Sequence, residues 1–193
     1  MNKRKHTSLL ISLILVSITI FLSGCVSENG DTRQSWLDTY TPVHSQGTGE
    51  NNFWITYPEK LSKSGVEVNH PQWVLDELEN NPILIVAGSD DCAPCIMQKR
   101  NINTVLETYE EQIQYFNIPT DGSDPRAWDA YNAYWSQDTS WYIPLTAIIT
   151  KGRDTDNEVA IYWHSSTGST GEQWISDFVK DAIYYHHVYK ENS

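Results

Sequence analysis

The sequence predicts an α/β domain in which helices flank a central mixed β-sheet. The continuous apolar run Ile83–Ala87 follows Pro82 and has the length of a strand buried on both faces. Beyond it, apolar residues recur at i, i+3, i+4 and i+7, the period of a helix with one buried face: Ile102, Val105, Leu106 and Tyr109. Taken along the chain, such patterns give the order β-α-β-α-β-α-β-β-α.

Local signals place the other elements. The first strand is expected either over residues 53–57 or over residues 65–68. Pro71 begins a helix whose apolar side chains are Trp73, Val74, Leu75 and Leu78. The remaining expected strands cover residues 113–118, 145–149 and 158–163, and the remaining expected helices cover residues 125–135 and 171–185. The last two strands are expected to pair antiparallel across a polar turn.

The beginning of the chain has the pattern of a secretory signal. Three basic residues at positions 3–5 precede Leu9–Leu22, a stretch without charge. Its 14 residues would span only about 21 Å as a helix, which is short of a hydrocarbon core of roughly 30 Å. Residues 1–24 therefore predict a cleaved signal peptide better than a membrane span.

The end of this signal, Leu22-Ser23-Gly24-Cys25, resembles a prokaryotic lipobox. The resemblance implies that Cys25 takes a diacylglyceryl group and becomes the new N-terminus, which would anchor the protein in the cell membrane facing the extracytoplasmic side. The alternative is an uncleaved signal anchor with an incidental cysteine. Residues 25–52 are rich in small polar and acidic residues, so we expect a lipidated N-terminus and flexible tether there, followed by the domain over residues 53–193.

Charge limits the partners. The sequence beyond Cys25 holds 10 basic and 25 acidic residues, a net charge of −15 with neutral histidines. Such a surface argues against binding to nucleic acid and against adhesion to anionic lipid headgroups.

The pair Cys92 and Cys95 is the main chemical signal. If Cys25 carries lipid, these are the two cysteines left, so a four-cysteine zinc site within one chain is excluded. Disulfides persist outside the cytoplasm, and the pair can be oxidised there. A structural staple is the least favoured interpretation, because so small a loop gives little entropic stabilisation.

The context of this pair resembles the thioredoxin fold over roughly residues 65–188. A buried strand leads directly into Cys92-Ala93-Pro94-Cys95 at a helix N-terminus, and Ile143-Pro144 precedes the strand at 145–149. The resemblance implies a thiol-disulfide oxidoreductase that acts on protein thiols and disulfides. Cys92 would attack, because free N–H groups at a helix N-terminus stabilise a thiolate, and Cys95 would resolve the mixed disulfide.

The resemblance also implies a cis peptide bond at Pro144, with the backbone of Ile143 pairing with the substrate chain. The alternative is a trans proline that opens a strand. The reaction needs no cofactor besides the Cys92–Cys95 disulfide. It does need a membrane or extracytoplasmic redox partner to reset that pair.

Two positions depart from the family. Asp91, preceded by Asp90, replaces the tryptophan that thioredoxins have before the first cysteine. These carboxylates could raise the pKa of the Cys92 thiol or cap the helix. Val86 stands where the family has a buried acid, so the usual route for the proton of the second cysteine is missing.

Two further alternatives remain open. The segment 120–143 holds six aromatic residues that either form a substrate groove or pack a helix on the sheet: Trp128, Tyr131, Tyr134, Trp135, Trp141 and Tyr142. The rival function is a metallochaperone that holds Cu(I) or Zn(II) through the two cysteines. Its extra ligand would be a histidine such as His164, His186 or His187, but the C-x-x-C spacing favours redox exchange.

Overall fold

The computed structural model describes residues 36–191. The expected signal peptide and the lipidation site at Cys25 lie outside this range. Within it, no helix has both the length and the apolar composition needed to cross a membrane.

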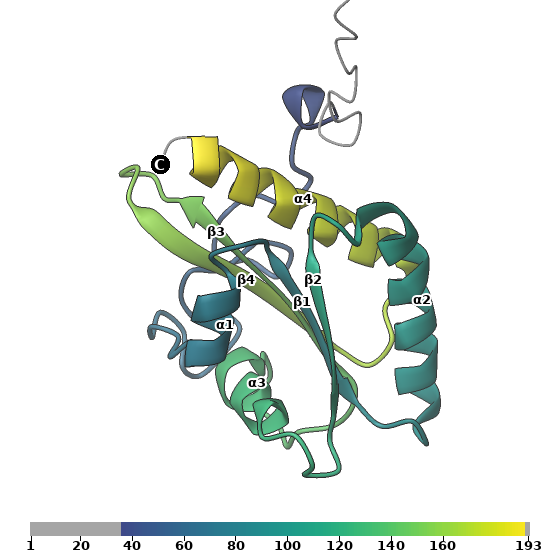
Figure 1. The fold of residues 1–193 in the computed structure, drawn as a ribbon. Helices are drawn as coiled ribbons and strands as arrows, with labels where there is room; N and C mark the ends of the chain where they lie inside the picture. The colour runs from purple at the N-terminus through teal and green to yellow at the C-terminus, as the bar shows by residue number, and fades with distance from the viewer. Residues whose placement is uncertain (1–35, 192–193) are drawn as a thin grey trace, which may run out of the picture. The chain divides into compact units, whose positions relative to one another are not determined.

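Five helical elements and four strands make up the described chain, and Figure 1 shows their arrangement. In chain order they are a 3-10 helix Leu37–Thr39, α1 Gln72–Glu77, β1 Ile83–Gly88, α2 Ala93–Tyr109, β2 Gln114–Pro119, α3 Arg126–Tyr134, β3 Leu145–Arg153, β4 Val159–Thr167 and α4 Glu172–Glu191. All four helices expected from sequence are present. The final hairpin extends further than expected, because β3 and β4 pair along their whole lengths. The last helix also runs beyond the expected residue 185, to Glu191.

The strands form one mixed sheet in the order β2-β1-β3-β4. β1 and β2 are parallel, whereas β3 is antiparallel to both β1 and β4. In Figure 1, α2 and α4 lie on one side of the sheet, and α1 and α3 lie on the other. The expected mixed sheet with flanking helices is therefore confirmed.

β1 is buried along its whole length because both faces of the sheet are covered. Alternate residues of a strand point to opposite faces. Ile83, Ile85 and Ala87 belong to the core cluster that includes side chains of α1 and α3. On β3, Thr150 donates a hydrogen bond to the carbonyl of Ala182 in α4 at 2.8 Å, which places the alternate residues on the α2 and α4 side.

The expected opening strand is not formed, and both candidate segments were wrong. The two segments make only isolated bridges, one of which joins Thr56 of the first segment to Glu67 of the second. Trp54 alone reaches the sheet, where its N–H and carbonyl bond the backbone of Trp163 at 2.8 and 3.0 Å. Pro58 has no N–H and cannot continue such a pairing.

The segment that we expected to be a tether up to residue 52 packs on the domain from Leu37 onward. Its anchor is Asp181 of α4, which is fully buried. The Asp181 carboxylate accepts hydrogen bonds from the Tyr40 hydroxyl at 2.6 Å, the Val43 N–H at 3.0 Å and the His44 N–H at 2.7 Å. The Nδ1 of the His44 ring also lies 2.7 Å from this carboxylate. Four contacts from a single stretch therefore hold these residues on α4.

The segments that hold the cysteine pair and Pro144 lie at one edge of the sheet. β1 ends at Gly88 beside Pro119, the last residue of β2, and Ala87 lies opposite Leu145, the first residue of β3. Leu145 in turn pairs with Thr167, the last residue of β4. Four segments therefore leave the sheet at this edge: residues 89–92, 120–125, 141–144 and 168–171.

Candidate redox site

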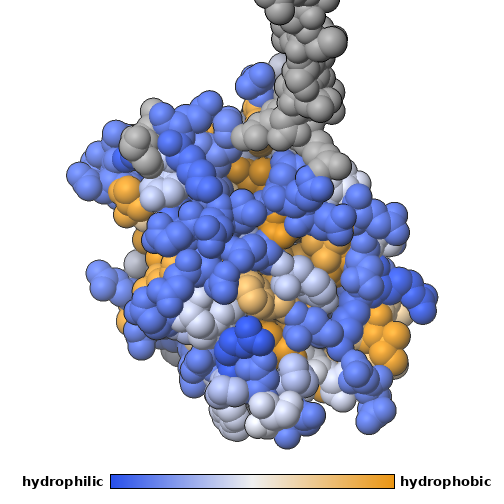
Figure 2. All heavy atoms as spheres, in the orientation of Figure 1, coloured by the Kyte–Doolittle hydropathy of each residue, from blue (hydrophilic) through white to orange (hydrophobic). Residues whose placement is uncertain are grey.

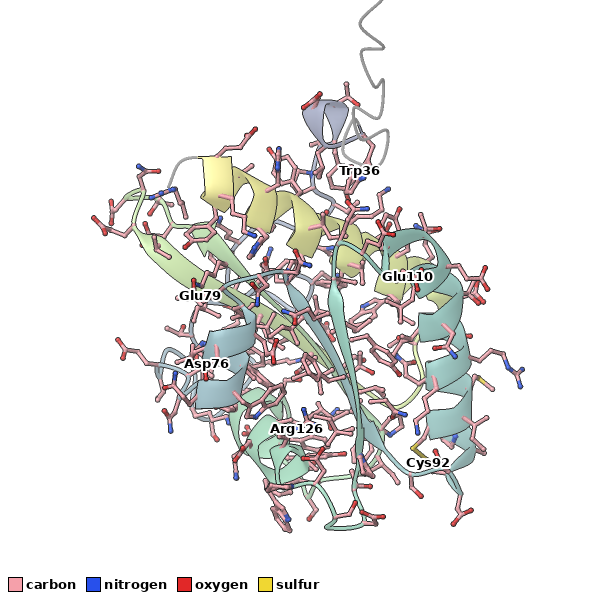
Figure 3. All side chains as sticks on the ribbon, viewed as in Figure 1. Trp36, Asp76, Glu79, Cys92, Glu110 and Arg126 are labelled. Atoms are coloured by element: carbon pink, nitrogen blue, oxygen red, sulfur yellow. A yellow bond between two sulfur atoms is a disulfide. The ribbon has the colours of Figure 1, made fainter. Side chains whose placement is uncertain are left out.

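Cys92 and Cys95 form a disulfide at the start of α2, with their Cα atoms 5.2 Å apart. Figure 3 shows Cys92 at the N-terminal end of this helix. Cys92 is the N-cap residue and half-buried, and its sulfur accepts a hydrogen bond from the Cys95 N–H at 3.3 Å. Cys95 is fully buried. An attacking partner can therefore reach Cys92 and not Cys95.

Pro94 fits the first turn of α2. The first N–H groups of a helix have no partner within it, so a residue without an N–H costs little there. The Cys92 sulfur accepts from one of these groups, the Cys95 N–H, and the partial positive charge of the helix end stabilises a thiolate there.

Pro144 lies next to the cysteines, and the Ile143–Pro144 peptide bond is cis, as the resemblance implied. Gly88 shows how close the two segments are. A Cβ atom at this glycine would stand 3.0 Å from the Cys95 sulfur and 3.5 Å from the Cβ of Pro144. Sequence reasoning missed Gly88, although a glycine between a buried strand and a C-x-x-C is a signal for close backbone approach.

The backbone of Ile143 is open. Its N–H and carbonyl form no hydrogen bond with another residue in the range 36–191, whereas the Pro144 carbonyl accepts from the Gly168 N–H at 2.9 Å. An extended peptide could use both groups of Ile143 in the way that a neighbouring strand would.

Asp90 and Asp91 do not cap α2, because the cap is Cys92 itself. The Asp90 carboxylate pairs with the ammonium of Lys99 at 2.7 Å, and its side chain is 95% exposed. An ion pair so open to water contributes little to stability. Asp91 is exposed, and its N–H bonds the Ser89 hydroxyl at 3.2 Å.

Gln98 ties the first turns of α2 to the rest of the site, and sequence reasoning missed it. It is fully buried one turn after Cys95. Its amide nitrogen donates to the hydroxyls of Thr146 and Thr170, both at 3.0 Å, and its amide oxygen accepts from the Thr170 N–H at 2.6 Å. The signal was a glutamine on the buried stripe of the helix, three residues after Cys95. Val86 is also buried, so β1 supplies no carboxylate at that position.

The histidines considered as metal ligands have other partners. His164 is buried, and its Nδ1 donates to the carbonyl of Asn52 at 2.7 Å. Burial lowers the pKa of His164 to about 3. His186 contacts the Asn80 carbonyl at 3.2 Å, and His187 lies 3.3 Å from Glu191. Over residues 36–191, no three side chains of His, Cys, Asp or Glu are grouped to hold a metal ion.

The aromatic segment divides into a buried part and an exposed part. Tyr131, Tyr134 and Trp135 are buried and pack α3 on the sheet. Trp128, Trp141 and Tyr142 are exposed and line a hollow of about 390 Å³. Ile143 lines the same hollow, which therefore adjoins the cis-proline.

No protein-family model matches this chain, and no curated protein matches its sequence. Solved structures similar to it include mitochondrial thioredoxin 3 from Saccharomyces cerevisiae, with 14% identity over 57% of this chain and 87% of that chain and a TM-score of 0.39. Thioredoxin from Trichomonas vaginalis has 16% identity over 56% and 88%, with a TM-score of 0.40. A thioredoxin-family thiol:disulfide interchange protein from Chlorobium tepidum has 13% identity over 56% and 83%, with a TM-score of 0.38.

The topology of the chain itself defines its fold. A mixed sheet in the order β2-β1-β3-β4 carries a C-x-x-C disulfide at the start of α2 and a cis-proline just before β3. This is the arrangement of the thioredoxin fold. A cysteine pair so placed is typical of thiol-disulfide chemistry.

Proposed function

We propose that this protein is a membrane-anchored, extracytoplasmic thiol-disulfide oxidoreductase that exchanges disulfides with protein substrates. One observation carries the proposal: the disulfide joins a reachable Cys92 at a helix N-terminus to a fully buried Cys95, beside the cis-proline. The signal-like residues 1–24 and the lipobox-like ending at Cys25 support the anchoring and the location.

The exchange balances without a cofactor. In the reducing direction, the Cys92 thiolate attacks one sulfur of a substrate disulfide, forms a mixed disulfide and releases the first substrate thiolate. The Cys95 thiolate then attacks the Cys92 sulfur, closes the Cys92–Cys95 disulfide and releases the second substrate thiolate. Two electrons and two protons pass to the substrate, and a membrane or extracytoplasmic redox partner returns them to the pair. The oxidising direction is the reverse.

The site residues have separate roles in this proposal. The helix end stabilises the Cys92 thiolate. The open N–H and carbonyl of Ile143 pair with the extended substrate chain, and Pro144 lies beside Gly88, which Cys95 also approaches. Asp90 and Asp91 add negative charge beside Cys92, which opposes thiolate formation and tunes the reactivity of the pair.

Trapping of mixed disulfides tests the proposal. Cys95→Ser should accumulate covalent complexes with substrate proteins through Cys92, because the resolving thiol is gone. Cys92→Ser is the matched control and should trap few, since Cys95 is buried. Equal trapping by both variants, or trapping by neither, would contradict the assigned roles.

A further inference from the structure

The hollow beside Ile143 has large aromatic side chains in contact with solvent. Trp128 is 61% exposed, Trp141 41% and Tyr142 46%. Trp128 is on α3, whereas Trp141 and Tyr142 belong to the segment that leads to the cis-proline. Exposed aromatic residues gathered around one concavity are typical of a binding surface.

These rings are held in place before any ligand arrives. Trp141 packs against Trp128 and Tyr131, with ring centroids 5.3 and 5.2 Å apart. The Tyr131 hydroxyl donates to the Tyr142 carbonyl at 3.0 Å, and the Tyr142 hydroxyl lies 2.6 Å from that of Thr167 at the end of β4. A ligand that binds here pays little for ordering the side chains.

One acidic residue lines the hollow, and two more lie in a second hollow that shares it. Asp121 lines both hollows, and the second, of about 470 Å³, is also lined by Asp90, Asp91 and Lys99. Lys99 is already paired with Asp90. Neither Asp91 nor Asp121 has an ion-pair partner among the side chains from 36 to 191. Hydrophilic residues also dominate the face shown in Figure 2, in keeping with the acidic sequence.

We propose that the aromatic hollow binds an arginine side chain of the substrate, so that basic polypeptides are the preferred substrates. This inference rests on the proposed function and names its substrate class. A chain paired with the backbone of Ile143 runs past the hollow, because Ile143 lines the hollow and the next residue, Pro144, lies beside Gly88 and Cys95. Indole faces attract cations, and the carboxylate of Asp121 at the rim completes the complementarity.

Arginine fits better than the other candidates. A purely apolar side chain would gain from the rings but nothing from Asp121 or Asp91. Lysine has a compact, strongly hydrated ammonium that is costlier to place against rings than the flat guanidinium. An acidic side chain would meet carboxylates of its own sign.

Peptide disulfides of one length test the inference. Each carries one residue near the reacting cysteine: arginine, citrulline, leucine or glutamate. Citrulline has the size and planarity of arginine without its charge. With the reduced full-length protein at low salt, we expect kcat/KM for the arginine peptide to exceed that for the citrulline peptide about five-fold, with glutamate slowest. The ratio should fall as salt is added.

Three variants localise the effect. Trp128→Leu and Asp121→Asn should each lower the arginine-to-citrulline ratio to about two or less. Glu107→Gln is the charge-matched control and should keep the full ratio. Glu107 is exposed and lies near the C-terminal end of α2, roughly 20 Å along the helix from its first residue. Equal rates for the four peptides with wild-type protein, or an unchanged ratio in Trp128→Leu, would overturn the inference.

Direct binding separates this inference from the proposed function. Calorimetry with the same peptides, in which serine replaces the cysteine, should show tighter binding of the arginine peptide whether or not exchange occurs. Tighter arginine binding without any exchange would support the hollow and contradict the oxidoreductase. Exchange with all peptides at one rate would support the oxidoreductase and contradict arginine binding in the hollow.

Discussion

The buried amide of Gln98 is the polar contact on which we expect the site to depend most. It joins α2 to Thr146 on β3 and to Thr170 in the loop before α4, and its three shortest hydrogen bonds are 3.0, 3.0 and 2.6 Å long. Gln98→Leu keeps the approximate volume and removes every one of these bonds. The Thr170 N–H then loses its side-chain acceptor.

The cost can be worked from these contacts. A net contribution of about 1 kcal/mol for each bond gives roughly 3 kcal/mol. The added apolar contact of leucine offsets part of this, so we expect the free energy of unfolding to fall by about 2–3 kcal/mol. For a domain of this size the midpoint of thermal unfolding should fall by about 5–10 °C.

Urea unfolding of the full-length protein measures this change, with the slope m as a check that the unfolded state is the same. Gln173→Leu is the matched control, because its amide bonds only the exposed Asp177 at 2.7 Å. That control should stay within about 0.5 kcal/mol of wild type. A Gln98→Leu variant as stable as the control would refute the view that this amide holds α2 in place.

Three other changes have defined outcomes. Asp181→Asn should lower the free energy of unfolding by about 3 kcal/mol, because a buried carboxylate with several donors loses its charge. Limited proteolysis should then cut residues 37–52 faster than in wild type. Unchanged cleavage would contradict the anchoring of this segment by Asp181. Gly88→Ala brings a Cβ to 3.0 Å from the Cys95 sulfur. It should lower the free energy of unfolding by about 1–3 kcal/mol in a urea titration and slow disulfide exchange in a peptide assay. Wild-type values in both measurements would argue against the close approach. Burial lowers the pKa of His164 to about 3 and of His70 and His186 to about 4, below the unfolded value of about 6.5, so the stability present above pH 6.5 should be lost as the pH falls toward 4. The urea midpoint should drop between pH 7 and pH 5, and His164→Phe should reduce that drop; a flat midpoint would show that these rings protonate freely in the folded protein.

The sequence predicted the secondary structure best where the spacing of apolar residues matches the buried face of one element. The apolar run at residues 83–87 predicted β1, and the i, i+3, i+4 pattern after Cys95 predicted α2, because each pattern matches the geometry of one element. The cysteine pair and Pro144 were found from short motifs.

What the sequence missed depends on contacts between distant residues. Nothing local shows that Asp181 collects donors from residues 40–44, so a packed segment was read as a tether. The residues at 53–57 look like a strand, but Trp54 alone bonds the sheet. Capping of α2 by Asp90 or Asp91 was one of two alternatives left open, and the Cys92 sulfur takes that place.

The reduction potential of the Cys92–Cys95 pair shows whether this disulfide can take part in thiol-disulfide exchange. The full-length protein would be equilibrated against defined thiol buffers without metal, and the state of Cys92 and Cys95 read by alkylation and mass spectrometry. We expect one reversible two-electron transition between about −270 mV, typical of a reductant, and about −120 mV, typical of an oxidant. A pair that shows no reversible transition, or one whose thiols are protected by a metal that copurifies, would contradict the proposed exchange.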